Sequence, residues 1–284
     1  MPRSFLLRAC ALLVLLLVTG GLPGPARATP SLDGCTGYVT LAANGAAVIN
    51  APGVWCLDHD LEGPMTGLSP IRVWIGADDV VLDCRGYRIL GDPGNPNYPT
   101  AVQALDHSRV TVRNCTIQGF HRGIFVGWID QYASGLLVED NLLVDNTFAM
   151  DTQLEHSVVQ RNRVRGSIAG IAAGPDSDIL DNLVEGVSDF GIALVWPNGG
   201  EVRGNTIRVP DNVAGVTHAI RIRNPQPITG RERGSIRDNV IVGGLGSVGV
   251  SCDHPDGRYA DNLFTGVATV NDGCTDAGDN DVSP

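Results

Sequence analysis

Four side chains have the types needed for acid–base chemistry on a sugar: Asp151, Asp189, His218 and Arg221. A histidine can remove the C5 proton of a uronic acid while an arginine stabilises the neighbouring carboxylate. His218 and Arg221 lie three residues apart in the sequence. Asp189, on a neighbouring repeat, would tune the pKa of the histidine. These residues form one hypothesis, the β-elimination or epimerisation of a uronate.

A pair of carboxylates suggests a second chemistry, the hydrolysis of a glycosidic bond. Inverting glycosidases hold their two carboxyl groups about 6.5–9.5 Å apart. If Asp151 and Asp189 lie on alternate turns of a stacked repeat, two rises of ~4.8 Å would separate them by ~9.6 Å. That spacing is close to the inverting range, although a register shift of one residue would destroy it.

Aromatic and charged side chains near these positions are candidates for substrate binding. Sugar rings stack on aromatic faces, and their hydroxyl groups need charged or amide partners. Small residues such as Ala172, Gly174 and Ala193 lie between them and would form a floor. The alternative is that these are ordinary exposed turn residues. The candidates are His121, Arg122, Phe125, Trp128, Trp196 and Arg223.

A recurring asparagine indicates how the chain must be organised to bring these residues together. Each asparagine adjoins a short alternating apolar stretch, and most are followed by a glycine-containing turn and a second stretch. The intervals between successive asparagines are 27, 21, 20, 23, 34, 23 and 18 residues. The mature chain offers no segment of helical period. The asparagines are Asn114, Asn141, Asn162, Asn182, Asn205, Asn239, Asn262 and Asn280.

Short strands with this period predict an all-β fold, a parallel β-solenoid of about nine or ten coils. A side-chain amide both donates and accepts, so amides stacked one coil apart can bond to one another as an internal ladder. The alternative is that the Asp-Asn pairs are simply turn residues. A leucine-rich repeat would need a helical half, and a β-sandwich would not explain the recurring asparagine.

Alignment of the second strand of each unit predicts which side chains share one outer face, because strand residues alternate between core and exterior. Two outward columns result. One column is Phe125, Asp151, Ala172, Ala193, Arg221 and Ser251, and the next is Gly127, Gln153, Gly174, Val195, Arg223 and Asp253.

The segments 80–89 (VVLDCRGYRI) and 110–120 (VTVRNCTIQGF), followed by Gly123 and Ile124, resemble the opening coils of a known superfamily. These are the secreted right-handed parallel β-helix proteins of the pectate-lyase-like superfamily, including NosD-type and carbohydrate-binding and sugar hydrolysis repeats. The resemblance covers about residues 70–270 and implies the fold. The superfamily contains lyases, hydrolases, epimerases and adhesins, so it does not fix the function.

The resemblance also raises the question of cofactors. Lyases of this fold often use Ca²⁺ with a lysine or arginine, but all 20 basic residues here are arginine. The acidic groups resemble turns rather than a calcium site. A NosD-like copper role would need clustered histidine or methionine, whereas the six histidines are scattered. We expect no cofactor and no metal.

The cysteines after residue 28 predict three disulfides. Stacked residues lie ~4.8 Å apart, within the Cα separation of about 4.4–6.8 Å that a disulfide accepts. Their scatter lacks the close spacing of zinc ligands. The alternative for the middle pair is two buried free thiols. The predicted pairs are Cys35–Cys56, Cys84–Cys115 and Cys252–Cys274, with separations of 21, 31 and 22 residues.

The first 28 residues have the pattern of a signal peptide: two arginines, a ten-residue apolar run and a small-residue cleavage site at Ala26–Ala28. The run is too short to span a bilayer. We expect a cap over residues 29–69, the β-helix over 70–270 and a C-terminal tail over 271–284. A secreted or periplasmic location follows.

The net charge bears on the partner. Without the leader, which holds three of the 20 arginines and no acid, the balance is 17 − 31 = −14. This argues against nucleic acid, and modestly against a polyanionic glycan. We expect a monomer without a membrane span that binds, and possibly cleaves or epimerises, an extracellular polysaccharide or cell-surface glycan. The alternative is a non-catalytic structural or surface-interaction module. The sequon Asn114-Cys115-Thr116 is expected to be buried with the ladder.

Overall fold

The computed structural model describes residues 34–68, 70–92, 95–127, 133–195, 199–211, 215–223 and 234–284. The predicted signal peptide lies outside the described residues. Within these ranges the chain forms strands, turns and bends, and no helix long and apolar enough to cross a membrane is found there. Every strand pair is parallel, and the strands form three sheets.

The three sheets run the length of the molecule. In the described residues the eleven-stranded sheet contains β1 Gly37–Tyr38, β3 Gly53–Cys56, β5 Val80–Asp83, β8 Thr111–Arg113, β11 Leu137–Glu139, β14 Val158–Gln160, β17 Asp178–Leu180, β20 Glu201–Arg203, β23 Ser235–Arg237, β26 Arg258–Ala260 and β29 Thr275–Asp276. The ten-stranded sheet contains β2 Ala47–Ile49, β4 Ile71–Ile75, β7 Thr100–Ala104, β10 Arg122–Val126, β13 Phe148–Thr152, β16 Ala169–Ala173, β19 Phe190–Val195, β22 Thr217–Arg223, β25 Ser247–Cys252 and β28 Thr269–Asp272. The nine-stranded sheet contains β6 Arg88–Leu90, β9 Thr116–Gln118, β12 Leu142–Val144, β15 Arg163–Arg165, β18 Leu183–Glu185, β21 Thr206–Arg208, β24 Val240–Val242, β27 Leu263–Thr265 and β30 Asp281–Ser283.

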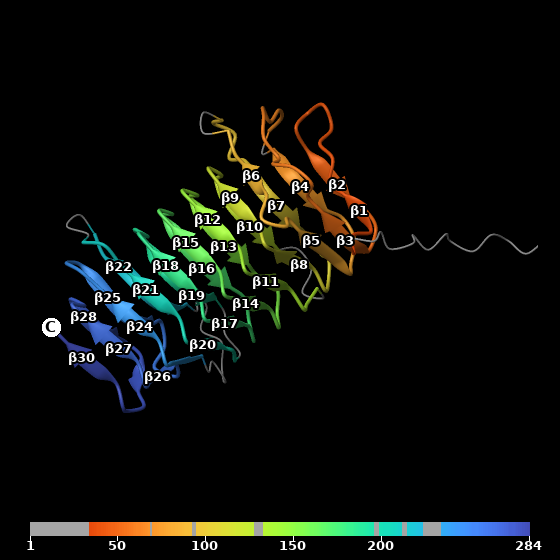
Figure 1. Ribbon diagram of the computed structural model, residues 1–284. Coiled ribbons are helices and arrows are strands. Elements are labelled where there is room, and N and C mark those ends of the chain that lie inside the picture. Colours follow the sequence, from red (N-terminus) through yellow and green to blue (C-terminus); the bar gives the residue numbers. More distant parts are fainter. Residues whose placement is uncertain are drawn as a thin grey trace, which may run out of the picture.

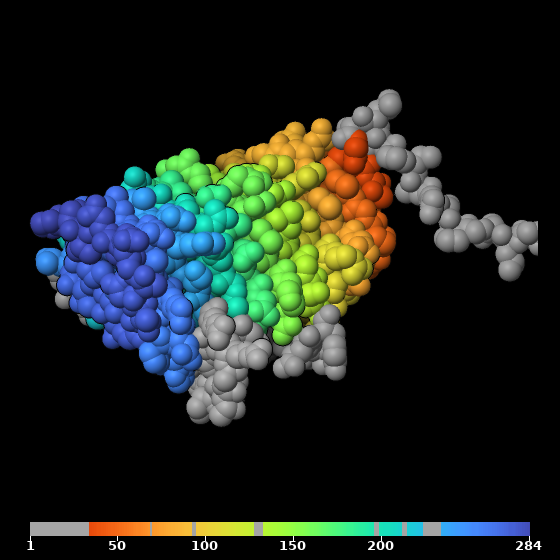
Figure 2. All heavy atoms as spheres, turned by 90° about the horizontal axis from the view of Figure 1, so that it is seen from below, coloured from red at the N-terminus to blue at the C-terminus, as the bar shows by residue number. Residues whose placement is uncertain are grey.

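From β5 to β28 each coil contributes one strand to each sheet and then passes to the next coil (Figure 1). The earlier strands β1 to β4 belong to the eleven- and ten-stranded sheets. The sequence colours follow one another as bands along the long axis, so each segment contacts its neighbours in the stack (Figure 2). This is the predicted right-handed parallel β-helix. The pairing also reaches into both terminal segments that the sequence analysis set apart, since β2 pairs with β4 and β27 with β30.

Aliphatic side chains stack in files inside the coils. One file of the eleven-stranded sheet and one of the nine-stranded sheet show the pattern, since all their members have no exposed surface. Valine and isoleucine dominate because β-branched side chains fit a pleated, buried surface. The two files are Val112, Val138, Val159, Ile179, Val202 and Ile236, and Ile117, Leu143, Val164, Val184, Ile207 and Ile241.

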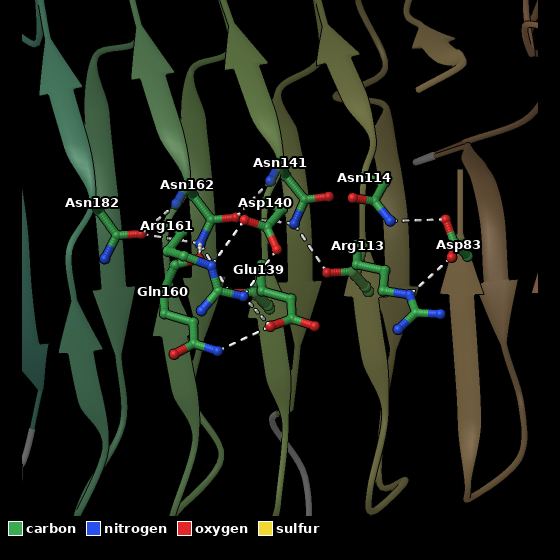
Figure 3. Close-up of polar contacts among 12 residues, drawn as sticks. Asp83, Arg113, Asn114, Glu139, Asp140, Asn141, Gln160, Arg161, Asn162 and Asn182 are labelled. Carbon is green, nitrogen blue, oxygen red and sulfur yellow. Dashed lines mark hydrogen bonds and ion pairs between the residues drawn. The ribbon is translucent and has the colours of Figure 1, made fainter. Parts of the chain in front are cut away.

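Seven asparagines form a continuous file at the turn between the eleven- and nine-stranded sheets. The amide of Asn141 donates to the side-chain oxygen of Asn162, and Asn162 donates to Asn182, both at 3.0 Å (Figure 3). The same bond recurs through Asn205, Asn239, Asn262 and Asn280. Each buried amide also donates to a main-chain carbonyl, so the file fixes the turns of successive coils.

Asn114 does not belong to this file, contrary to the sequence prediction. Arg113 pairs with Glu139, which places Cys115, rather than Asn114, opposite Asn141. The Cys115 N–H donates to the Asn141 side chain at 3.0 Å. Asn114 instead has a left-handed φ of 55°, is exposed, and donates to Asp83 at 3.1 Å. The asparagine of the sequon is therefore exposed, and the disulfide-bonded Cys115 occupies the position of an amide in the file.

All three predicted disulfides are confirmed. Cα separations are 5.9 Å for Cys35–Cys56, 4.8 Å for Cys84–Cys115 and 4.9 Å for Cys252–Cys274. Each bridge joins neighbouring coils, which is why the spacing of about one coil anticipated the pairing. Disulfides of this kind are consistent with an oxidising, extracellular environment.

A buried arginine holds the first coils together. Arg72 on β4 has no exposed surface, and its guanidinium donates to the carbonyls of Gly45 (2.8 Å), Gly63 (2.7 Å) and Leu90 (3.1 Å). Burial lowers the pKa of Arg72, while the charge of Asp92 opposes that shift. One side chain therefore ties two early loops to the end of β6.

Candidate functional site

The outer face of the ten-stranded sheet carries a line of side chains in register, which we call the central file. The strand pairing confirms the predicted column from Phe125 to Ser251. It also extends the column by Trp74 and Gln103 at one end and by Asp272 at the other. The central file is Trp74, Gln103, Phe125, Asp151, Ala172, Ala193, Arg221, Ser251 and Asp272, and Val48 on β2 precedes it in register with Trp74.

The file is recessed. Phe125, Ala193 and Ser251 point away from the core, yet only 5%, 3% and 5% of their surface is exposed. Polar groups along this floor therefore lie in a partly desolvated setting, where a hydrogen bond or charge has more effect than on an open surface.

One polar centre of the file surrounds Asp151. Gln153 donates to the Asp151 carboxylate at 3.0 Å, and the Arg122 guanidinium stacks over the Phe125 ring, 4.3 Å from its centroid. Burial raises the pKa of Asp151, while the Gln153 hydrogen bond and the Arg122 charge oppose the shift. The Arg122 Nε is buried with no hydrogen-bond partner among the described residues. This centre therefore combines an aromatic ring, a guanidinium group and a carboxyl group with a raised pKa.

The second polar centre surrounds His218. Burial lowers the pKa of His218, as does the positive charge of Arg221, while three carboxylates oppose the shift: Asp189, Asp272 and Asp253. Its Nδ1 is buried and has no hydrogen-bond partner in the described chain. The Arg221 guanidinium forms an ion pair with Asp253 at 3.2 Å. The centre therefore holds an imidazole whose pKa is lowered, beside an arginine that is paired with a carboxylate.

The structure brings the three residues of the uronate hypothesis together, because Asp189 and Arg221 both act on the charge of His218. Asp253 and Asp272 were absent from the predicted site. The sequence held a signal for Asp272, since extending the predicted column one coil past Ser251 reaches it. Asp253 was placed in the adjacent column but not recognised as the partner of Arg221.

Asp151 belongs to a different part of the surface. In the central file it is separated from Arg221 by Ala172 and Ala193, which makes three strand steps, or ~14 Å. Asp151 and His218 therefore cannot act on one bond.

The predicted spacing of Asp151 and Asp189 is wrong. Asp189 precedes Phe190, which aligns through Ala169 with Phe148, three residues before Asp151. An offset of about four residues along the strands, ~13 Å, adds to the two rises between coils and gives ~16 Å. The prediction counted coils but ignored displacement along the strand. A pair this wide lies outside the inverting range of about 6.5–9.5 Å.

His121 lies at the corner between the nine- and ten-stranded sheets rather than over the central file. Its ring packs edge-on against Tyr98, with centroids 4.8 Å apart, and against Phe148 at 5.5 Å. Burial and the Arg122 charge lower the pKa of His121. Beside it is a groove of about 540 Å³. Tyr98 was missed because its loop was treated only as an insertion between strands.

Of the remaining predicted binding residues, Arg223 is described by the structure and the two tryptophans are not. Arg223 ends β22, is exposed and pairs in register with Val195, at the edge of the face that carries His218. Trp128 and Trp196 lie outside the described residues. Among the residues described, no group of three or more His, Cys, Asp or Glu side chains is arranged to hold a metal ion.

Comparison with known proteins shows no family for this chain. No protein-family model and no curated protein matches the chain. Among solved structures, the Streptococcus pneumoniae surface protein and adhesin PfbA is similar over 84% of this chain and 83% of that chain, with 11% identity and a TM-score of 0.37.

Proposed function

We propose that the chain binds a neutral extracellular polysaccharide along the outer face of its ten-stranded sheet. The observation that carries this proposal is the central file, in which aromatic, amide, carboxyl and guanidinium groups recur in register on successive strands. A linear polymer lying along the stack would meet one side chain of the file every ~4.8 Å, with Ala172 and Ala193 between the two polar centres. Aromatic rings favour the apolar faces of sugars, and the polar groups favour their hydroxyls. Trp128 and Trp196 remain proposed stacking residues.

The charges of the face favour a neutral glycan over a uronate. Arg221 is already paired with Asp253 at 3.2 Å. Two further carboxylates, Asp189 and Asp272, lie close enough to act on His218. A uronate carboxylate would have to displace Asp253 and approach these groups, whereas a sugar hydroxyl can donate to them.

Binding is tested with a variant that removes the positive charge of Arg221 and with a matched control. We expect Arg221→Gln to weaken binding to a neutral polysaccharide about tenfold, the effect of one charge-assisted hydrogen bond. Arg163→Gln serves as control, because Arg163 is an exposed arginine on the nine-stranded sheet. Affinity is measured by titration calorimetry over a panel of neutral and uronate polysaccharides. Absence of binding across the panel would overturn the proposal and favour a non-catalytic surface-interaction module.

One observation favours catalysis as a second candidate. The His218 Nδ1 is buried without a hydrogen-bond partner in the described residues, and burial lowers the pKa of this imidazole, which favours its neutral form. A neutral imidazole beside an arginine can act as a general base in elimination or epimerisation. Incubation with uronate polysaccharides tests this, since elimination creates an ultraviolet-absorbing unsaturated product that His218→Gln should no longer form. New reducing ends without unsaturation would point to hydrolysis instead.

A further inference from the structure

A groove of about 540 Å³ lies at the corner between the nine- and ten-stranded sheets, outside the central file. The described residues between β6 and β7, which are Asp92 and residues 95–99, provide one wall. The other wall comes from the turns that precede β10 and β13. Its polar and aromatic lining includes Asp92, Asn95, Tyr98, His121, Asp145 and Thr147.

The described walls of the groove are fixed in place. Asn95 donates from its side chain to the Met65 carbonyl at 3.1 Å and accepts from the Asn97 N–H at 3.0 Å. The Pro99 carbonyl accepts from the N–H groups of His121 (3.0 Å) and Arg122 (3.2 Å). From the interior, Arg72 donates to the carbonyl of Leu90, where the loop begins. A groove held this way loses little conformational entropy when a ligand binds.

Several groups in the groove are available for a ligand. Tyr98 is 66% exposed, and its ring meets His121 only edge-on. Within the described chain, no hydrogen bond engages the Tyr98 phenol, the Thr147 hydroxyl or the His121 imidazole. Asp145 is exposed, and one of its oxygens has a long contact of 3.4 Å from the Gln118 amide. The groove therefore offers an aromatic face, a hydroxyl, an imidazole and a carboxylate oxygen.

We infer that this corner groove is a subsite for a single neutral sugar residue, stacked on Tyr98 and hydrogen-bonded to Asp145, Thr147 and His121. The inference rests on the proposed function, since His121 leads directly into Arg122 at the edge of the central file. A residue at a chain end or branch would occupy the groove while the rest of the polymer follows the sheet. The exposed Asp145 carboxylate repels a uronate and accepts hydrogen bonds from sugar hydroxyls.

The subsite is tested with Tyr98→Ala and Asp145→Asn. Asparagine tolerates the left-handed φ of 51° at position 145, so the second variant removes only the charge. Tyr87→Ala is the matched control, because Tyr87 is a tyrosine of 38% exposure between β5 and β6, at a different corner. The probes are cellohexaose, maltohexaose and hexagalacturonate, titrated into the full chain by calorimetry, with Arg221→Gln in parallel.

We expect Tyr98→Ala to weaken binding of a neutral hexasaccharide about tenfold, as removal of one aromatic platform does. We expect a smaller loss for Asp145→Asn and none for Tyr87→Ala. If the wild type binds and Arg221→Gln weakens it, but Tyr98→Ala binds as the wild type does, the subsite is refuted and the proposed function stands. If the wild type binds no neutral probe, the proposed function itself fails. Preferential binding of hexagalacturonate would overturn the assignment of a neutral sugar.

Discussion

Replacing Asn205 by alanine removes a central member of the asparagine file. Asn205 is fully buried, and its amide donates to the carbonyls of Ile179 (2.9 Å) and Arg203 (3.1 Å) and to Asn239 (3.0 Å). Its side-chain oxygen accepts from the backbone N–H and the amide of Asn182, at 2.9 and 3.0 Å. The substitution thus deletes five hydrogen bonds.

The loss of stability follows from the backbone groups that the substitution leaves without a hydrogen-bond partner. The Asn182 N–H loses the side-chain acceptor on which it depends, and the Ile179 carbonyl loses a donor, both in a setting without water. Each buried unsatisfied group costs about 1–3 kcal/mol, so the free energy of unfolding should fall by about 3–5 kcal/mol. Asn114→Gly is the control. Asn114 has one side-chain bond, to Asp83, and glycine accepts its left-handed φ of 55°, so this variant should cost below about 1 kcal/mol.

The assay is urea denaturation followed by circular dichroism, combined with hydrogen exchange at the Asn182 amide. We expect that amide to lose protection in Asn205→Ala, because stability in a stacked repeat is local. If Asn205→Ala cost no more than Asn114→Gly, and the Asn182 amide stayed protected, the file would not be a stabilising element.

Three further predictions concern other parts of the molecule. A Cys84→Ser, Cys115→Ser double variant should lose about 3–4 kcal/mol in urea denaturation, because the bridge closes a loop of 31 residues; an unchanged midpoint would contradict this. Arg72→Met should lower the free energy of unfolding by about 2–4 kcal/mol, because three carbonyls lose their donor while one desolvated charge is removed. An unchanged melting temperature would refute the anchoring role of Arg72. Burial raises the pKa of Asp151, so the folded state binds the carboxyl proton more tightly than the unfolded state does. The free energy of unfolding therefore falls as the pH rises from the pKa of the unfolded state to that of the folded state. Asp151→Asn should therefore melt higher than the wild type at neutral pH and converge with it in acid; a constant difference would count against the buried carboxyl.

The fold was predictable because residues that stack in successive coils recur in the sequence at intervals of about one coil. Each asparagine must lie one coil from the next to share a hydrogen bond, and each cysteine must do so to reach its partner. Asn114 shows where such a pattern misleads. The position one residue before the file has a left-handed φ, which also favours asparagine. In this coil Cys115 is at the file position and Asn114 is at the position before it, so the sequence alone does not show which of the two positions the asparagine occupies.

The site was predictable only along the axis of the stack. Strand alternation placed Phe125, Asp151 and Arg221 in one column. The position of Asp189 along the strand direction depends on how each turn enters β19, and coil counting does not contain that information. The groove beside Tyr98 depends on how an irregular loop packs against a corner, which periodicity does not describe.

The asparagine file has a consequence for how the length of this protein can change. The bonds between its side chains all run in the same direction, because each asparagine from Asn141 to Asn262 donates to the side-chain oxygen of the asparagine in the next coil. Asn162 and Asn182 are 20 residues apart and make equivalent bonds, so excision of residues 163–182 would present Asn205 to Asn162 with the same donor and acceptor. Whole coils are thus interchangeable units. Duplication or loss of one coil would add or remove one strand of each sheet without interrupting the asparagine file.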